Sequence, residues 1–228
     1  MKTNNVSFIA SPKVRINQEW TASFALEGGI VSKRLEHSTL LYPNQLNSTG
    51  LNGNPQEITE EKGVLNTDFS VGALFYSPYL YFGYAMHHVL EPNISFTDNP
   101  DGVLYRRHTG HVGVNIDLPA SPHERRLGKA PRISPQIIFQ QQGPARELNL
   151  GLYYTKNKFT SGIWYRNEDS IILLVGVQSR KFSFGFSYDV TISKLSNNTF
   201  GALELSTAYK FNCRSKKPGL PKAECPSF

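Results

Sequence analysis

The histidines carry the most versatile chemistry in this sequence, because an imidazole can bind a metal ion or transfer a proton near neutral pH. His87 and His88 are adjacent, whereas His108 and His111 lie three residues apart. In an extended strand both spacings place the two side chains on opposite faces, because side chains alternate along a strand. Neither pair can chelate one metal ion without distortion, so we expect histidines in loops or in a barrel interior and no metal site.

Two carboxylates near the C-terminus, Asp189 and Glu204, could accept hydrogen bonds inside a barrel, but no motif pairs them for catalysis. The serines lack the nucleophile elbow of a hydrolase, and no glycine-rich phosphate loop is present. We therefore predict that the chain is not an enzyme, takes no small-molecule substrate and needs no cofactor. An outer-membrane lipase or protease is the least favoured alternative.

The two cysteines, Cys213 and Cys225, both lie in the last sixteen residues of the chain. Their spacing does not match a zinc motif, and no histidine is nearby. A local disulfide, formed in an oxidising compartment such as the periplasm, and a pair of idle thiols in a tail are both open. We treat residues 212–228 as a basic tail that follows a barrel region at residues 1–211.

The composition indicates that strands position these side chains. Aromatic residues make up 12% of the 228 residues, led by 14 Phe and 11 Tyr, which favours β-structure. The mean hydropathy is -0.36, and no apolar run approaches the ~18 residues that a transmembrane helix needs. Transmembrane barrels escape that test, because every second residue of their strands is polar.

The segment FSFGFSYDV, residues 182–190, shows the expected strand pattern. Aromatic side chains alternate with small or polar ones, so one face of the strand is apolar and the other is polar. A soluble sandwich would bury the apolar face, whereas an outer-membrane barrel would turn it toward lipid. The alternation alone fits both.

Similar segments recur to the end of the chain, joined by short polar turns, and no segment shows a convincing helical stripe. Their length of about 9 to 11 residues suits a tilted strand that crosses a bilayer. Glycines recur on the small face, where close packing or sheet curvature explains them. We expect loops at residues 36–65 and 90–105. The eleven expected strands are 6–17, 19–34, 67–76, 80–87, 108–118, 132–142, 148–154, 159–166, 171–179, 182–190 and 201–211.

The formal net charge of +6 makes anionic surfaces conceivable partners. The basic residues are scattered over strand ends and loops, and no aromatic-interleaved nucleic-acid motif accompanies them. We therefore predict no nucleic-acid partner. The N-terminal MKTNNVSFIASPKVRINQEW has no apolar stretch of a signal peptide, so we expect either a cytoplasmic protein or a processed or truncated piece of a longer chain.

The run LNLGLYYTKNKFTSGIWYRNEDSIILLVGVQSRKFSFGFSYDVTISKLSNNTFGALELSTAYKF, residues 148–211, resembles the C-terminal half of the PorP/SprF family. The motifs WYRNEDSIILLVGVQ, FGFSYDVTISKL and GALELSTAYKF carry the resemblance, together with the basic tail that ends in CPSF. The earlier FSVGALFYSPYLYFGYAMHHVLEPN resembles paired strands of that family. The resemblance covers roughly residues 5–228 and suggests a member truncated at its N-terminus.

The resemblance implies an all-β, antiparallel transmembrane β-barrel in the outer membrane, which assists type IX secretion, gliding motility and adhesin display. The implied partners are other type IX secretion components, surface adhesins and outer-membrane lipid. The residues that we expect to face lipid are Phe182, Phe184, Phe186, Tyr188, Leu203, Leu205, Tyr209 and Phe211.

Two other functions remain open from the sequence. A porin-like transport channel would use the same strands around a conducting lumen. A soluble β-barrel would instead bury the apolar face and bind a small hydrophobic ligand.

Overall fold

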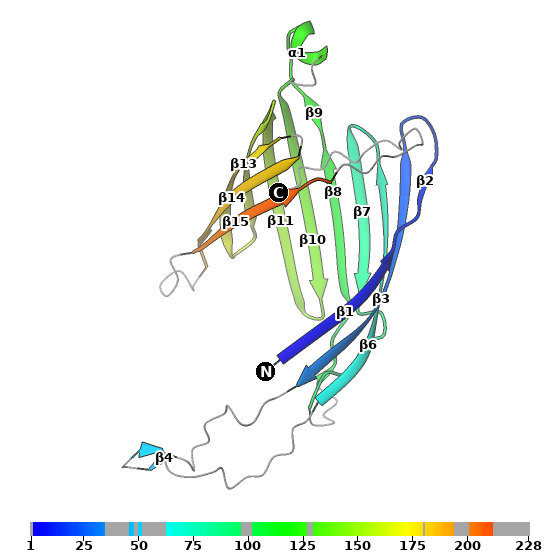
Figure 1. Cartoon of the computed structure of the whole chain (residues 1–228), viewed down its shortest axis with the longest axis vertical. Coiled ribbons are helices and arrows are strands. Elements are labelled where there is room, and N and C mark those ends of the chain that lie inside the picture. The colour runs from blue at the N-terminus through cyan, green and yellow to red at the C-terminus, as the bar shows by residue number, and fades with distance from the viewer. Residues whose placement is uncertain are drawn as a thin grey trace. The chain divides into compact units, whose positions relative to one another are not determined.

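The computed structural model describes residues 2–34, 46–47, 50–51, 63–96, 102–126, 130–179, 181–193 and 201–211. These residues form a predominantly β structure (Figure 1). The strands are β1 (Lys2–Ala10), β2 (Lys13–Arg15), β3 (Thr21–Arg34), β4 (Leu46–Asn47), β5 (Gly50–Leu51), β6 (Gly63–Tyr76), β7 (Leu80–His87), β8 (Arg107–Val114), β9 (Ile116–Asp117), β10 (Arg132–Gln142), β11 (Ala145–Lys156), β12 (Phe159–Arg166), β13 (Ser170–Gln178), β14 (Phe182–Thr191) and β15 (Ala202–Tyr209), and α1 is Pro122–Arg126.

One antiparallel sheet of 13 strands contains every strand except β4 and β5, which pair with each other. Its main path runs β1-β3-β6-β7-β8-β10-β11-β12-β13-β14-β15, while β2 adds to β3 and β9 adds to β10. The strands at the two ends of this path, β1 and β15, each have one neighbour among the described residues, so the sheet is open. The prediction of an all-β, antiparallel fold with roughly eleven main strands is confirmed.

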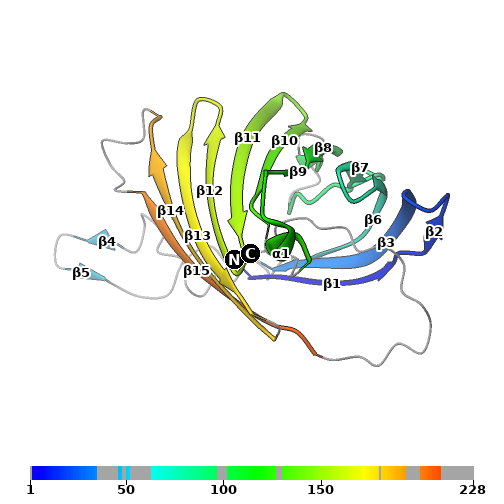
Figure 2. The same cartoon turned by 90° about the horizontal axis from the view of Figure 1, so that it is seen from above.

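The described chain divides into two compact units. Unit 1 takes its residues from 1–10, 26–71 and 87–106, and unit 2 from 11–25, 72–86 and 107–228. In unit 1, β1 pairs with the second part of β3, from Lys2↔Arg34 to Ala10↔Leu26. Unit 2 holds β2 and all strands from β8 onward, and Figure 2 shows its strands β10 to β14 side by side along a curved sheet.

Hairpin turns join consecutive strands of unit 2, as their composition predicts. Only two residues separate β11 from β12 and β10 from β11. Asn157 and Gly143 adopt positive φ angles of 60° and 55° in these turns, a conformation that Asn and Gly tolerate better than other residues. The tight turns fix the register of the paired strands on either side.

Two strands of unit 1 begin earlier than the alternation predicts. β1 begins at Lys2 instead of Val6, because the polar Thr3 and Asn4 pair with β3 residues. β6 begins at Gly63, inside the loop expected at residues 36–65. Ladder hydrogen bonds to a neighbouring strand override the weak strand propensity of polar residues. Most of that expected loop lies outside the described residues.

The short helix α1 spans five residues, too few for the helical stripe that the sequence lacks. The hydroxyl of Ser121 accepts a hydrogen bond from the Glu124 backbone N–H, and the Glu124 carboxylate accepts one from the Ser121 backbone N–H. This reciprocal arrangement is a capping box, and Pro122 occupies the first helical position, where its missing N–H costs nothing. No helix in the part of the chain described here has the length and apolar character needed to cross a membrane.

Candidate functional site

The two faces of the sheet have opposite chemistry, and β11 in unit 2 shows this clearly. Leu148, Leu150 and Leu152 are 37–46% exposed on one face. On the other face, Asn149 and Tyr153 are no more than 9% exposed. The sequence alternation therefore separates an exposed apolar face from a buried, largely polar one.

The same inversion holds across the described residues. Leu, Ile, Val and Phe are usually the residues that a soluble protein buries, yet here they are among the exposed ones. The buried hydrophobic residues are Ala22, Tyr76, Tyr81 and Tyr153. The buried polar residues are Thr21, Ser23, Ser70, Ser77, Asn115, Ser134, Gln136, Asn149, Thr160, Ser170 and Ser183. An exposed apolar surface around a polar interior is typical of a transmembrane β-barrel.

The residues predicted to face lipid lie on β14, on β15 and just beyond it. Their exposed fractions range from 37% to 80%. Strand pairing joins Phe182 to Tyr209, Phe186 to Leu205 and Tyr188 to Leu203. Directly paired residues of an antiparallel sheet share a face, so these side chains form one apolar surface of unit 2.

Aromatic rings gather at one end of this surface. The ring centroids of Phe182 and Tyr209 are 4.9 Å apart, and those of Tyr209 and Phe211 are 4.7 Å apart. A second cluster on unit 2 contains Phe75 and Phe82, with centroids 5.3 Å apart. Both clusters lie near the turns at the same end of the unit 2 strands. Aromatic clusters at a strand end are typical of the interface between bilayer and water.

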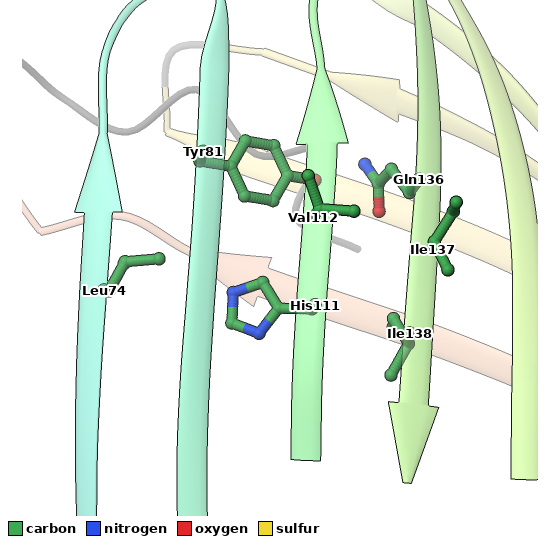
Figure 3. A pocket seen from close by; sticks show the side chains of 7 residues that line it. All are labelled: Leu74, Tyr81, His111, Val112, Gln136, Ile137 and Ile138. Carbon is green, nitrogen blue, oxygen red and sulfur yellow. The ribbon is translucent and has the colours of Figure 1, made fainter.

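On the opposite face, β7 and β8 each place a ring over a glycine of the other strand. The ring of Tyr81 lies over Gly113, where an added Cβ would overlap its atoms. The imidazole of His111 lies over Gly83, with Nε2 2.8 Å from where a Cβ would be. Figure 3 shows both side chains in the space between β7 and β8. We call this arrangement a reciprocal ring–glycine pair.

A second reciprocal ring–glycine pair joins β11 and β12. Trp164 is the cross-strand partner of Gly151, and Tyr153 is that of Gly162. An added Cβ at Gly151 would overlap the indole, and one at Gly162 would lie 2.7 Å from the Tyr153 ring. The two rings contact each other edge to face, with centroids 5.8 Å apart. These glycines therefore leave room for the rings, in agreement with the packing role expected for glycines on this face.

His87, His88 and His108 each lie within hydrogen-bonding distance of a different side chain. His88 Nδ1 lies 2.7 Å from an Asp68 carboxylate oxygen, and His87 Nδ1 lies 3.2 Å from the Ser70 hydroxyl. His108 Nδ1 lies 2.6 Å from the Tyr84 hydroxyl. The described residues contain no group of three or more His, Cys, Asp or Glu side chains that could hold a metal ion.

The carboxylate predicted at Asp189 lies in a charged cluster on the polar face. Arg166 Nη1 is 3.1 Å from Asp169 and 3.7 Å from Asp189, while its Nε is 3.7 Å from Glu147. Glu204 lies on the same face of the sheet, opposite Ser187. The arrangement can hold the ends of β11 to β14 together electrostatically. The cysteines predicted as a possible disulfide, Cys213 and Cys225, lie outside the described residues.

The ring–glycine pairs were not predicted from the sequence, although it contains a signal for them. Each participating strand has a ring and a glycine two residues apart on one face, in YFG, HVG, GLY and GIW. Antiparallel pairing can then place each ring over the glycine of the other strand. Which ring meets which glycine depends on the register of the two strands, and the separate motifs do not encode that register.

A family model described as "Type IX secretion system membrane protein PorP/SprF" matches residues 1–209 of the chain. No curated protein and no solved structure matches the chain.

Proposed function

The chain belongs to the PorP/SprF family of type IX secretion system membrane proteins, since the family model covers nearly all of it, and we propose that it is a non-enzymatic barrel component of this system. In this role it assists the secretion or surface anchoring of adhesins through protein contacts. Its location is the outer membrane. The family match carries the assignment to secretion, and the exposed apolar face supports the membrane role.

In the proposed role, the apolar surface on β14 and β15 contacts lipid. Exposed leucines and phenylalanines would be unfavourable in water at this density, whereas hydrocarbon accepts them. The aromatic cluster of Phe182, Tyr209 and Phe211 supports an interface position for one end of these strands.

Loop lengths suggest the orientation. Successive antiparallel strands connect at alternate ends, so residues 35–62, 88–106 and 192–201 connect strands at one end. The opposite end carries the two-residue turn after β11, the three-residue turns after β6 and β13, and the chain after β15, together with one longer connection at residues 118–131. Outer-membrane barrels have short periplasmic turns and longer extracellular loops. We therefore assign the residues after β15, including the basic tail at 212–228, to the periplasm.

The proposed partners are other type IX components, which the tail contacts from the periplasmic side, and adhesins, which the long loops contact outside. Support for gliding motility comes only from the sequence resemblance. The absence of an enzymatic activity stays a prediction.

The experiment that tests this function is deletion of the gene and complementation. We expect the deletion to abolish surface display of a secreted adhesin and the full chain to restore it. A chain ending at Phe211 should still insert as a folded barrel, judged by its shifted electrophoretic mobility without heating, but should restore display poorly. Normal adhesin display in the deletion strain would contradict the proposed function. Display restored fully by the shortened chain would contradict only the role of the tail.

A further inference from the structure

A cavity in unit 2 lies beside the β7–β8 ring–glycine pair. Its volume is about 200 Å³, and it extends over β6, β7, β8 and β10 (Figure 3). Its lining is mostly apolar and contains no Asp, Glu, Lys or Arg. The lining residues are Leu74, Tyr81, His111, Val112, Gln136, Ile137 and Ile138.

One polar side chain that lines this cavity has a buried nitrogen without a hydrogen-bond partner. Gln136 is 8% exposed, and its amide nitrogen Nε2 is buried without a hydrogen-bond partner. Gln136 and Ile138 pair across the sheet with Gly113 and His111, so the amide lies on the face that carries the two rings. A buried N–H without an acceptor costs free energy, and a ligand oxygen in the cavity would remove that cost.

We propose that this cavity binds a small uncharged molecule with an apolar body and one hydrogen-bond-accepting oxygen. The apolar lining disfavours a charged ligand, because burying an unpaired charge is costly. The volume suffices for a substituted benzene, since a cavity of about 150 Å³ binds benzene itself. The Gln136 amide donates its hydrogen bond to the ligand oxygen and fixes the orientation. This site is independent of the secretion role, and it adds a small-molecule ligand to a chain for which we expect no small-molecule substrate.

The test uses the full chain, refolded in detergent micelles and labelled with ¹³C at isoleucine methyl groups. The Ile138 methyl signal, assigned with the Ile138→Val variant, reports on the cavity. Acetophenone is the probe, and α-methylstyrene, in which a CH₂ group replaces the carbonyl oxygen, is the matched control ligand. We expect a saturable shift with acetophenone and at least tenfold weaker binding of α-methylstyrene, since the buried donor rejects an analogue without the acceptor.

Two variants distinguish the contribution of the Gln136 amide to binding from that of the apolar cavity. Gln136→Met removes the donor at similar length and should reduce acetophenone affinity to that of α-methylstyrene. Gln140→Met makes the same change four residues further along β10, on the same face, and should leave binding unchanged. A linear shift that is identical in the parent chain and in Gln136→Met would mean partition into micelles and would overturn the proposal. Equal binding of the two ligands to the parent chain would overturn it even if Gln136→Met does not fold.

Discussion

Aromatic rings occupy both faces of unit 2, and the two sets are packed differently. On the polar face, Tyr81 and Tyr153 are 6% and 8% exposed and lie over glycines of a neighbouring strand. On the apolar face, Phe182 and Phe184 are 49% and 53% exposed and stack on each other at 6.2 Å. The same class of side chain thus fills space between strands on one face and covers the surface on the other.

The difference shows which face specifies the fold. A ring over a glycine fits only when the two strands have one register, so the polar face determines pairing. If the apolar face contacts lipid as proposed, it needs only hydrophobic side chains of suitable size, because lipid adapts to their shape. We therefore expect the polar face to tolerate charge but to resist added volume at the glycines beneath the rings, and the apolar face to do the reverse.

The largest expected effect is that of a charge on the apolar face. Phe186→Arg, at the middle of β14, should destabilise the folded chain by roughly 2–4 kcal/mol if that face contacts the bilayer core. The measurement is urea unfolding in lipid vesicles. Ser187→Arg, the neighbouring position on the polar face opposite Glu204, is the matched control and should cost much less. Equal costs at the two positions would show that the faces do not differ in this way.

Added volume on the polar face should give the next largest effect. Gly151→Ala places a methyl group against the Trp164 indole and should cost about 1–3 kcal/mol through overpacking. In a chain that already carries Trp164→Ala, the same Gly151→Ala change should cost much less, because the indole is gone. Urea unfolding of the parent chain, both single variants and the double variant measures this difference.

Gly110→Ala is the control for the intrinsic effect of alanine, because no atom lies within 4 Å of the new methyl group. It should be close to neutral, since alanine also loses less chain entropy on folding than glycine. If Gly110→Ala and Gly151→Ala destabilise the chain equally, the rings do not require glycine.

The smallest effect concerns α1, which belongs to neither face of the sheet and serves as a reference for the comparison of the two faces. The backbone N–H of Ser121, followed by its hydroxyl, lowers the pKa of Glu124 below its ordinary value near 4.5. A lowered folded-state pKa stabilises the helix above pH 4.5, and this stabilisation is lost as the pH falls through the folded-state pKa.

The pH dependence of α1 can be followed by amide hydrogen exchange at residues 123–126. The protection factors there, which are corrected for the pH dependence of intrinsic exchange, should fall on acidification, while those in the strands should change less. Glu124→Gln should remove this pH dependence. An unchanged dependence in that variant would assign it to another group.

The sequence predicted much of the fold because strand alternation and hairpin turns are local. The bounds expected for β10 and β12, 132–142 and 159–166, are those of the structure. Prediction failed where a distant partner decides, as at the polar start of β1, where Lys2 pairs with Arg34 and Asn4 with Ser32 of β3. α1 was missed for another reason: its SPHE capping box is local, but the helix is too short for an apolar stripe.

The candidate surfaces were predictable to different degrees. The alternation identifies which residues share a face, but their contact with lipid remains a proposal. The cavity at Gln136 depends on four strands brought together by the sheet, and no local pattern encodes such a meeting. The same limit applies to the partners of Arg166, which come from three separate segments.

The reciprocal ring–glycine pairs have a consequence for the evolution of this chain. Gly151 and Trp164 cannot change independently, because a larger residue at the first position requires a smaller one at the second. Related chains should therefore show compensating substitutions at these positions, and likewise at Gly113 and Tyr81. Such coupled changes would record the order and register of neighbouring strands in sequences whose structures have never been determined.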